Sequence, residues 1–145
     1  MNIYTIGFTK KKAAEFFNIL KKAGIKRLVD IRLNNSSQLA GFTKSDDLKY
    51  FLKEICGIDY RHEPLLAPNE NILKEYKKGG GNWQKYEHDF IKLMSERKIE
   101  EKFKPELFEI PTVLLCSEQT SEHCHRRLVL EYLKKKWGNI NIINL

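Results

Sequence analysis

The sequence predicts an α/β protein, a single-domain three-layer α/β/α sandwich built on a mainly parallel sheet of about five strands. Short apolar runs alternate with longer segments whose apolar residues recur at helical spacing, which is typical of strands joined by helical crossovers. The run Val113-Leu114-Leu115 is apolar throughout, as expected of a central strand covered on both faces. A length of 145 residues suits one domain spanning 1–145.

Five strands are predicted, because each of five short segments is apolar and is followed by a turn-forming or polar residue. Gly7 ends the first segment, Asp30 interrupts the apolar run of the second, and Pro64 follows the third, which is more polar than the others. The predicted strands cover residues 3–6, 28–31, 58–62, 112–116 and 139–144.

Helices are predicted where apolar side chains return every three or four residues. The first helix ends at Gly24, a residue typical of helix C-termini, and Gly57 and Gly138 end two others in the same way. The predicted helices cover residues 10–23, 45–55, about 69–78, 83–94 and about 121–137. The resulting order is β-α-β-α-β-α-α-β-α-β, and helical crossovers between successive strands favour parallel pairing.

The formal net charge of +7 has two explanations. A positive protein can attract nucleic acids or small anionic ligands. Lysine supplies most of the excess, however, and is spread over the predicted helices. We interpret the lysines at 10–12 as the solvated start of one helix and those at 134–136 as the end of another, where positive charge suits the helix dipole. We therefore attribute most of the charge to solubility, and expect nucleic-acid binding to be weak and unspecific.

The sequence indicates a cytoplasmic protein without membrane contact. No apolar run approaches the roughly 20 residues that a membrane helix needs, and the first residues lack the pattern of a signal peptide. Three cysteines favour free thiols over a disulfide framework, because one of them would remain unpaired. Cys56, near a predicted helix end, is interpreted as a buried small apolar residue.

Polar and reactive side chains follow the predicted strands at their carboxyl ends. In a parallel sheet these ends share one edge, and open α/β sheets bind ligands there. Three further residues open the last helix, where backbone amides and an arginine favour an anion. The candidate residues are Thr5, Gly7, Asp30, Arg32, His62, Cys116, Glu118, Cys124, His125 and Arg126.

Asp30 and Arg32 alternate along one strand, so both side chains are expected on the same face. Arg32 could clamp a phosphate or carboxylate, with Asp30 orienting it, or the two could form a structural ion pair. Cys116 and Glu118 alternate in the same way. Cys116 is a candidate nucleophile or a buried apolar thiol, and Glu118 is a candidate acid or base or a helix-capping carboxylate.

Cys124 and His125, near Cys116, raise the question of zinc. The paired C-x-x-C spacing of structural zinc sites is missing. Adjacent residues on a helix also point about 100° apart, which disfavours joint ligation by Cys124 and His125. The sequence therefore predicts no bound metal, and we expect no cofactor.

The chain resembles an uncharacterised family, the domain-of-unknown-function family 488, in motifs spread over nearly its whole length. Segments 5–7, 29–32 and 60–62 match its Thr-Ile-Gly, Val-Asp-x-Arg and Tyr-x-His patterns, and Ser36 or Ser37 matches a nearby serine. The most specific matches are Leu-Leu-Cys-x-Glu at 114–118 and Cys-His-Arg at 124–126. Phe8 stands where the family often has histidine, and Leu66-Ala67 where it often has glycine. The resemblance implies the same fold and site, with Ser36 among the binding residues, and no reaction.

We expect an enzyme that binds a small anionic substrate, phosphorylated or nucleotide-like, at the carboxyl edge of the sheet. Arg32 and Arg126 would bind the anion, Glu118 would act as acid or base, Cys116 as nucleophile or wall, and His62 could shuttle protons. Two alternatives stay open, a nucleic-acid-binding module and a metal-stabilised domain without catalysis. The sequence does not indicate an oligomeric state or a particular substrate.

Overall fold

The structure is a computed structural model that describes residues 1–35, 41–117 and 124–145. At its centre lies a five-stranded sheet in which every pairing is parallel, with the order β3-β2-β4-β1-β5. The predicted fold class is confirmed, and each strand lies within two residues of its predicted position. The strands are β1 Asn2–Gly7, β2 Arg27–Asp30, β3 Asp59–His62, β4 Thr112–Cys116 and β5 Asn141–Asn144.

The central position belongs to β4, as its continuous apolar run predicts. β4 pairs with β2 on one side and with β1 on the other, and all five of its residues are buried. The register sets Gly7 of β1 opposite Cys116 and Asp30 of β2 opposite Leu115. The carboxyl ends of the three central strands therefore lie side by side at one edge of the sheet.

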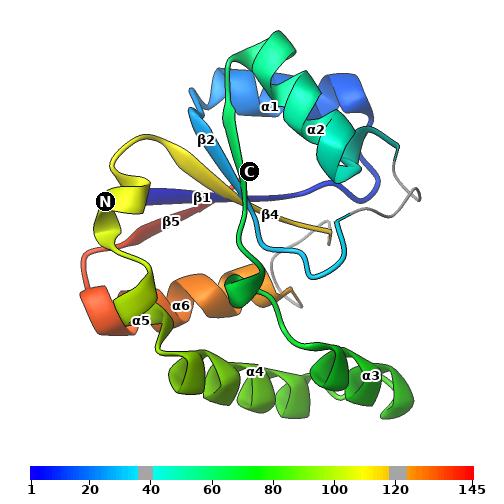
Figure 1. Cartoon of the computed structure of the whole chain (residues 1–145), viewed down its shortest axis with the longest axis vertical. Helices are drawn as coiled ribbons and strands as arrows, with labels where there is room; N and C mark the ends of the chain where they lie inside the picture. Colours follow the sequence, from blue (N-terminus) through cyan, green and yellow to red (C-terminus); the bar gives the residue numbers. More distant parts are fainter. Residues whose placement is uncertain (36–40, 118–123) are drawn as a thin grey trace.

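Helices cover both faces of the sheet (Figure 1). One face carries α1 and α2, and the other carries α6 with α3, α4 and α5. The helices are α1 Ala13–Lys22, α2 Ser45–Phe51, α3 Glu70–Lys78, α4 Trp83–Arg97, α5 Ile99–Lys102 and α6 His125–Trp137. This arrangement is the predicted three-layer sandwich.

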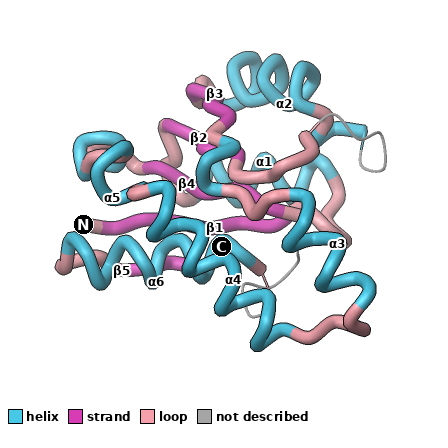
Figure 2. The backbone as a smooth tube through the Cα atoms, turned by 60° about the horizontal axis from the view of Figure 1, so that its bottom comes forward, coloured by secondary structure: helices cyan, strands magenta, loops and turns pink. Residues whose placement is uncertain are grey.

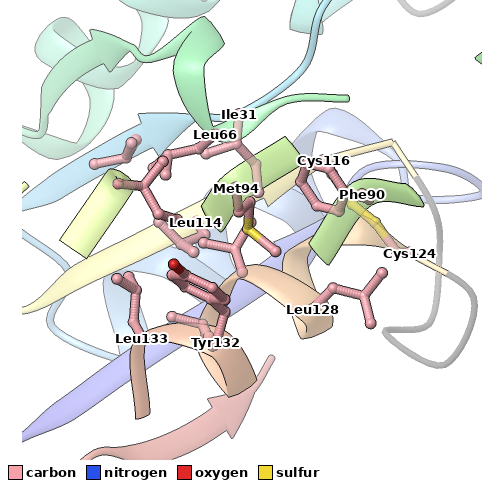
Figure 3. Packing of buried hydrophobic residues seen from close by; sticks show 14 of the residues in the cluster. Ile31, Leu66, Phe90, Met94, Leu114, Cys116, Cys124, Leu128, Tyr132 and Leu133 are labelled. Carbon is pink, nitrogen blue, oxygen red and sulfur yellow. A yellow bond between two sulfur atoms is a disulfide. The ribbon is translucent and has the colours of Figure 1, made fainter. Parts of the chain in front are cut away.

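Alternate residues of the central strand enter two separate hydrophobic cores, as the period of a strand requires. Leu115 packs with Phe16 of α1, on the α1–α2 face. Leu114 and Cys116 pack with Phe90 of α4, on the α6 face (Figure 3). The side chains at the carboxyl edge are thus divided between two faces according to their position along each strand.

Several boundaries differ from the prediction. The first helix begins at Ala13 rather than at residue 10, because the chain first makes a turn in which Lys10 has a left-handed φ of 63°. The helix predicted over 45–55 is α2 followed by a π-helical turn, Leu52–Cys56. The four-residue α5 was not predicted, since one helical turn is too short to show a period.

Short 3-10 turns, which weak local patterns do not reveal, occupy parts of the predicted loops. They cover Gly41–Thr43, Pro64–Leu66 and Pro105–Phe108, and Figure 2 shows the loops and turns that link the helices to the strands. Among the described residues, no helix combines the length and apolar character needed to cross a bilayer.

Candidate functional site

A topological switch point lies between β1 and β4, the two neighbouring strands at the middle of the sheet. β1 leads through α1, on one face, to β2; β4 leads through α6, on the opposite face, to β5. The chain therefore leaves these two strands in opposite directions (Figure 1). Open α/β sheets bind ligands in the crevice outside such a point, at the carboxyl ends of the strands.

The loops that leave the switch point are joined by hydrogen bonds. The backbone amide of Thr9, after β1, donates to the carbonyl oxygen of Ser117, after β4, over 3.0 Å. The hydroxyl of Thr9 donates to the same oxygen. These bonds hold the loop after β1, which carries Lys11, against the end of β4.

Two cations approach each other at this point. Arg126, in the first turn of α6, is almost completely buried, with 1% of its surface exposed. Lys11, in the loop between β1 and α1, is half-buried, and its pKa is lowered first by burial and then by the charge of Arg126. Like charges repel, and an anion bound near both side chains would be attracted to each of them.

Cys116 and Cys124 form a disulfide on the α6 face of the sheet (Figure 3). Cys116 is the last residue of β4, and Cys124 is the extended residue just before α6, so both side chains reach the same point. The prediction of three free thiols is therefore wrong for this pair. Counting three cysteines excluded a multi-bond framework, but one bond that closes a short loop remains compatible with an odd number.

The disulfide changes what the cysteines can do. In this form Cys116 carries no thiol, so a nucleophilic role would require reduction. Cys56 is the free cysteine among the described residues; it is half-buried, and burial raises the pKa of its thiol.

His125 lies beside the disulfide, in the first turn of α6. Its Nε2 lies 2.6 Å from the carbonyl oxygen of Ile31, and its ring meets Phe90 edge-on with 5.7 Å between the centroids. Because a carbonyl only accepts hydrogen bonds, Nε2 carries the proton and Nδ1 carries the lone pair. Burial lowers the pKa of His125 to about 4 although the hydrogen bond with Ile31 raises it, and the charge of Arg126 makes a smaller contribution to the lowering.

Cys116, Cys124 and His125 bring their ligand atoms within 4.8 Å of one another. The argument against joint ligation assumed that Cys124 belongs to the helix. Its backbone is extended instead, with φ −131° and ψ 141°, and α6 begins one residue later. Two adjacent residues with different backbone conformations can point to the same place, so that argument does not hold here.

Asp30 and Arg32 form a buried ion pair on the opposite, α1–α2 face. Arg32 donates from Nε and Nη2 to the two carboxylate oxygens of Asp30, both over 2.8 Å, and from Nη2 to the Thr43 carbonyl over 2.7 Å. The guanidinium also lies over the ring of Phe8, 5.3 Å from its centroid. The prediction that both side chains share a face is confirmed.

Tyr60 completes this ion-pair cluster. Its hydroxyl donates to Asp30 over 2.6 Å and accepts from the Asn35 side chain over 3.2 Å. Burial and then the neighbouring Asp30 raise the pKa of Tyr60, so the phenol stays protonated and remains a donor. His62 lies at the same end, with Nε2 2.8 Å from the carbonyl oxygen of Arg32.

The predicted site residues therefore divide into two groups at one edge. Cys116, Cys124, His125 and Arg126 gather on the α6 face, whereas Asp30 and Arg32 lie on the α1–α2 face with His62 nearby. Gly7 is the register partner of Cys116 and lies with the first group. Thr5 joins neither, because its hydroxyl donates to the side chain of Asn144 in β5. Glu118 and Ser36 lie outside the described residues.

Three residues of these groups were not predicted. Lys11 was interpreted as part of a solvated helix start, although Gly7 ends a strand and the apolar period begins only at Ala13, which places the lysine in a loop at the carboxyl edge. Tyr60 alternates with His62, a signal that would have placed it on the same face. No sequence signal indicated the Thr43 carbonyl.

The described surface also has two hollows that none of the predicted site residues lines. One hollow lies at the amino ends of β1 and β4, lined by Met1, Tyr4 and Phe108 among others. A second lies beside β3 and α5 and includes Arg61 and Lys102. Neither hollow contains a predicted site residue, so the chemistry of the side chains, rather than the shape of the described surface, identifies the carboxyl edge.

The low pKa of His125 predicts that the free energy of unfolding decreases as the pH is lowered from 7 to 4. Above pH 6.5 the ring is neutral in both states; below it the unfolded chain takes up a proton that the folded chain refuses until about pH 4. The pKa difference corresponds to about 3 kcal/mol, and partial solvent contact of the ring reduces our expectation to about 2 kcal/mol. Urea unfolding between pH 7 and 4 measures this loss.

His125→Gln should flatten this slope relative to the parent chain, with the disulfide intact in both. His88→Gln, which changes an exposed histidine of α4, is the matched control and should leave the slope unchanged. Equal slopes for His125→Gln and the parent would show that His125 does not titrate differently in the two states.

The fold and the site define a doubly wound parallel α/β protein with a basic, cysteine-containing site at a topological switch point. The family model of the domain of unknown function DUF488 matches residues 12–133, so the chain belongs to that family, as its motifs indicated. No curated protein and no solved structure matches the chain significantly.

Proposed function

We propose that the protein is an enzyme that acts on a small anionic substrate, phosphorylated or nucleotide-like, at the switch point between β1 and β4. The observation that carries the proposal is the approach of Lys11 and Arg126 at the place where such sheets bind ligands. Arg126 would hold the anion through its planar fork, and Lys11 would add a point charge. The substrate would be recognised by its negative charge and small size.

Electrostatics supports an anion at this place for two reasons. The charge of Arg126 lowers the pKa of Lys11, and an anion between them would replace this repulsion with two attractions. The 13-residue helix α6 also begins here, so its first backbone amides and its dipole favour negative charge at the same end. In this proposal Glu118 acts as the acid or base.

A thermal-shift screen of nucleotides and phosphorylated metabolites tests the proposal, because a ligand that binds the folded state raises its stability by mass action. We expect stabilisation by at least one compound with a phosphate and none by its dephosphorylated form. Compounds that bind are then incubated with the protein and their products analysed. Binding without any product would reduce the proposal to a binding module.

DNA and RNA oligonucleotides should also be titrated with the protein, at two salt concentrations. If only phosphate contacts act, binding falls steeply with salt, because it depends on the release of counterions. Tight, sequence-dependent binding that persists at physiological salt would instead favour a nucleic-acid-binding module over the small-anion enzyme.

Lys11→Gln should weaken binding of a stabilising phosphorylated ligand about tenfold, since it removes one partly screened charge from the site. Lys12→Gln is the matched control, because Lys12 is the next residue, carries the same charge and is exposed. Its affinity should stay within about twofold of the parent. Equal losses in both variants would mean that long-range charge, rather than a site at Lys11, attracts the ligand.

A further inference from the structure

We propose that the reduced chain binds one zinc ion through Cys116, Cys124 and His125. Two thiolates and one imidazole are a ligand set that zinc prefers, and three protein ligands leave the fourth tetrahedral position open. The proposal goes beyond the anion site and does not depend on any substrate. It replaces the expectation of no metal, whose geometric reason fails because Cys124 precedes the helix.

The backbone already brings the three side chains to one point. Their ligand atoms lie within 4.8 Å of one another, on residues that β4 and the start of α6 hold in place. The Cα atoms of the cysteines are 7.4 Å apart, beyond the roughly 4.4 to 6.8 Å of most disulfides. Two thiolates on a tetrahedral zinc lie about 3.8 Å apart, a separation that this backbone spacing accommodates.

His125 is oriented as metal-bound histidines usually are. Such histidines donate the proton of one ring nitrogen to a carbonyl or carboxylate and coordinate with the other nitrogen. Here Nε2 donates to the backbone carbonyl of Ile31 over 2.6 Å, which leaves the lone pair of Nδ1 for a metal. The ring is also held by its edge contact with Phe90, so little freedom would be lost on binding.

The surroundings of the sulfur atoms suit thiolates. Nη1 of Arg126 lies 3.6 Å from Sγ of Cys116, and a donor to a metal-bound thiolate stabilises its charge. Two thiolates balance the charge of one zinc ion, so the filled site would add no net charge to the core. Phe90 and Leu128 pack around the cysteines and limit the access of solvent (Figure 3).

The disulfide and the zinc site exclude each other, because both need the same two sulfur atoms. A dithiol reductant would break the bond between Cys116 and Cys124, giving them two electrons and two protons while its own two thiols become a disulfide. Zinc binding would then release the two thiol protons. The oxidised chain should therefore bind no zinc at this point, and the reduced chain should bind one equivalent.

Competition with a chromophoric zinc chelator tests the proposal without any substitution. Oxidised and reduced samples of the same chain are compared after removal of the reductant under argon, with folding checked by circular dichroism. We expect one zinc per reduced chain, and an affinity at least about 100-fold lower for the oxidised chain, since two of three ligands are lost. Equal binding by both forms, or no binding by the folded reduced form, would refute the site.

Cobalt(II) identifies the ligands, because its absorption spectrum reports thiolate bonding and tetrahedral coordination. Cys124→Ser and His125→Gln should each weaken metal binding by more than about 100-fold. This loss is larger than the one caused by removing a residue that only hydrogen-bonds to a metal ligand. Cys56→Ser is the matched control, since Cys56 is the cysteine outside the pair and should bind like the parent. Loss of binding only in Cys56→Ser would place the metal elsewhere. None of these measurements uses a substrate, so their failure leaves the anion site untouched.

Discussion

Asp30→Asn should lower the free energy of unfolding by about 3 kcal/mol or more, one of the two largest effects expected of a substitution in this protein. The change keeps the shape of the side chain and removes its charge. Arg32, 7% exposed, would keep a positive charge that now lacks its carboxylate, and Tyr60 would lose its charged acceptor. Breaking a buried ion pair from one side is costly for this reason.

Asp59→Asn provides the matched control for this experiment. Asp59 lies on the neighbouring strand β3 and also pairs with arginine, Arg27 at 3.2 Å and Arg61 at 3.4 Å, but 53% of its side chain is exposed. Exposed pairs contribute about 1 kcal/mol or less, so the loss should be small. Denaturant unfolding of both variants measures the difference. Similar losses would mean that the Asp30 pair is effectively solvated.

A second substitution tests whether the unpaired charge causes the loss. When Asp30→Asn is combined with Arg32→Met, no charge remains in the cluster, and the double variant should be more stable than Asp30→Asn alone. An additive loss would show that the packing of Arg32 over Phe8 matters more than its charge.

The sequence was sufficient for the strands because burial on both faces leaves a strong local signal. β4 was predicted over residues 112–116 and is found over Thr112–Cys116. The start of α6 was predicted about four residues too early, because Cys124 has an extended backbone and the helix begins only at His125. A helix start depends on a single backbone conformation that residue types alone do not determine.

The grouping of the site residues could be predicted only within one strand. Alternation placed Asp30 and Arg32 on one face, and their ion pair confirms it. Whether Cys116 shares that face depends on the register between β2 and β4. The register pairs Asp30 with Leu115, one residue before Cys116, and a shift of one residue changes the face of every side chain. Sequence patterns carry no information about this shift between distant strands.

The approach of Lys11 to Arg126 is also a product of topology. β1 and β4 are more than a hundred residues apart in the sequence, and only their pairing brings Thr9, after β1, against Ser117, after β4. The candidate residues near Cys116 were found because they share one sequence motif. Lys11 was not, because it reaches the same place from the other end of the chain.

Arg126→Met should reduce the affinity for a phosphorylated ligand about 100-fold or more, the second of the largest expected effects. Arg126 is 1% exposed, and losing one partner of a buried, hydrogen-bonded charge pair costs about 2 to 5 kcal/mol. Arg126→Lys keeps the charge but loses the planar fork, so its loss should be intermediate, about tenfold. Calorimetric titration with the best ligand of the thermal-shift screen measures these affinities.

Arg127→Met is the matched control, because Arg127 is the next residue of α6 and is paired at the surface with Glu87 at 3.5 Å and Glu131 at 3.1 Å. Its affinity should remain within about threefold of the parent, since exposed charges are screened by solvent and salt. Denaturant unfolding of each variant separates a lost ligand contact from a lost fold. If folded Arg126→Met binds the ligand as tightly as Arg127→Met, the anion does not bind at the switch point. The proposed zinc site at Cys116 and Cys124 would not be affected by that result.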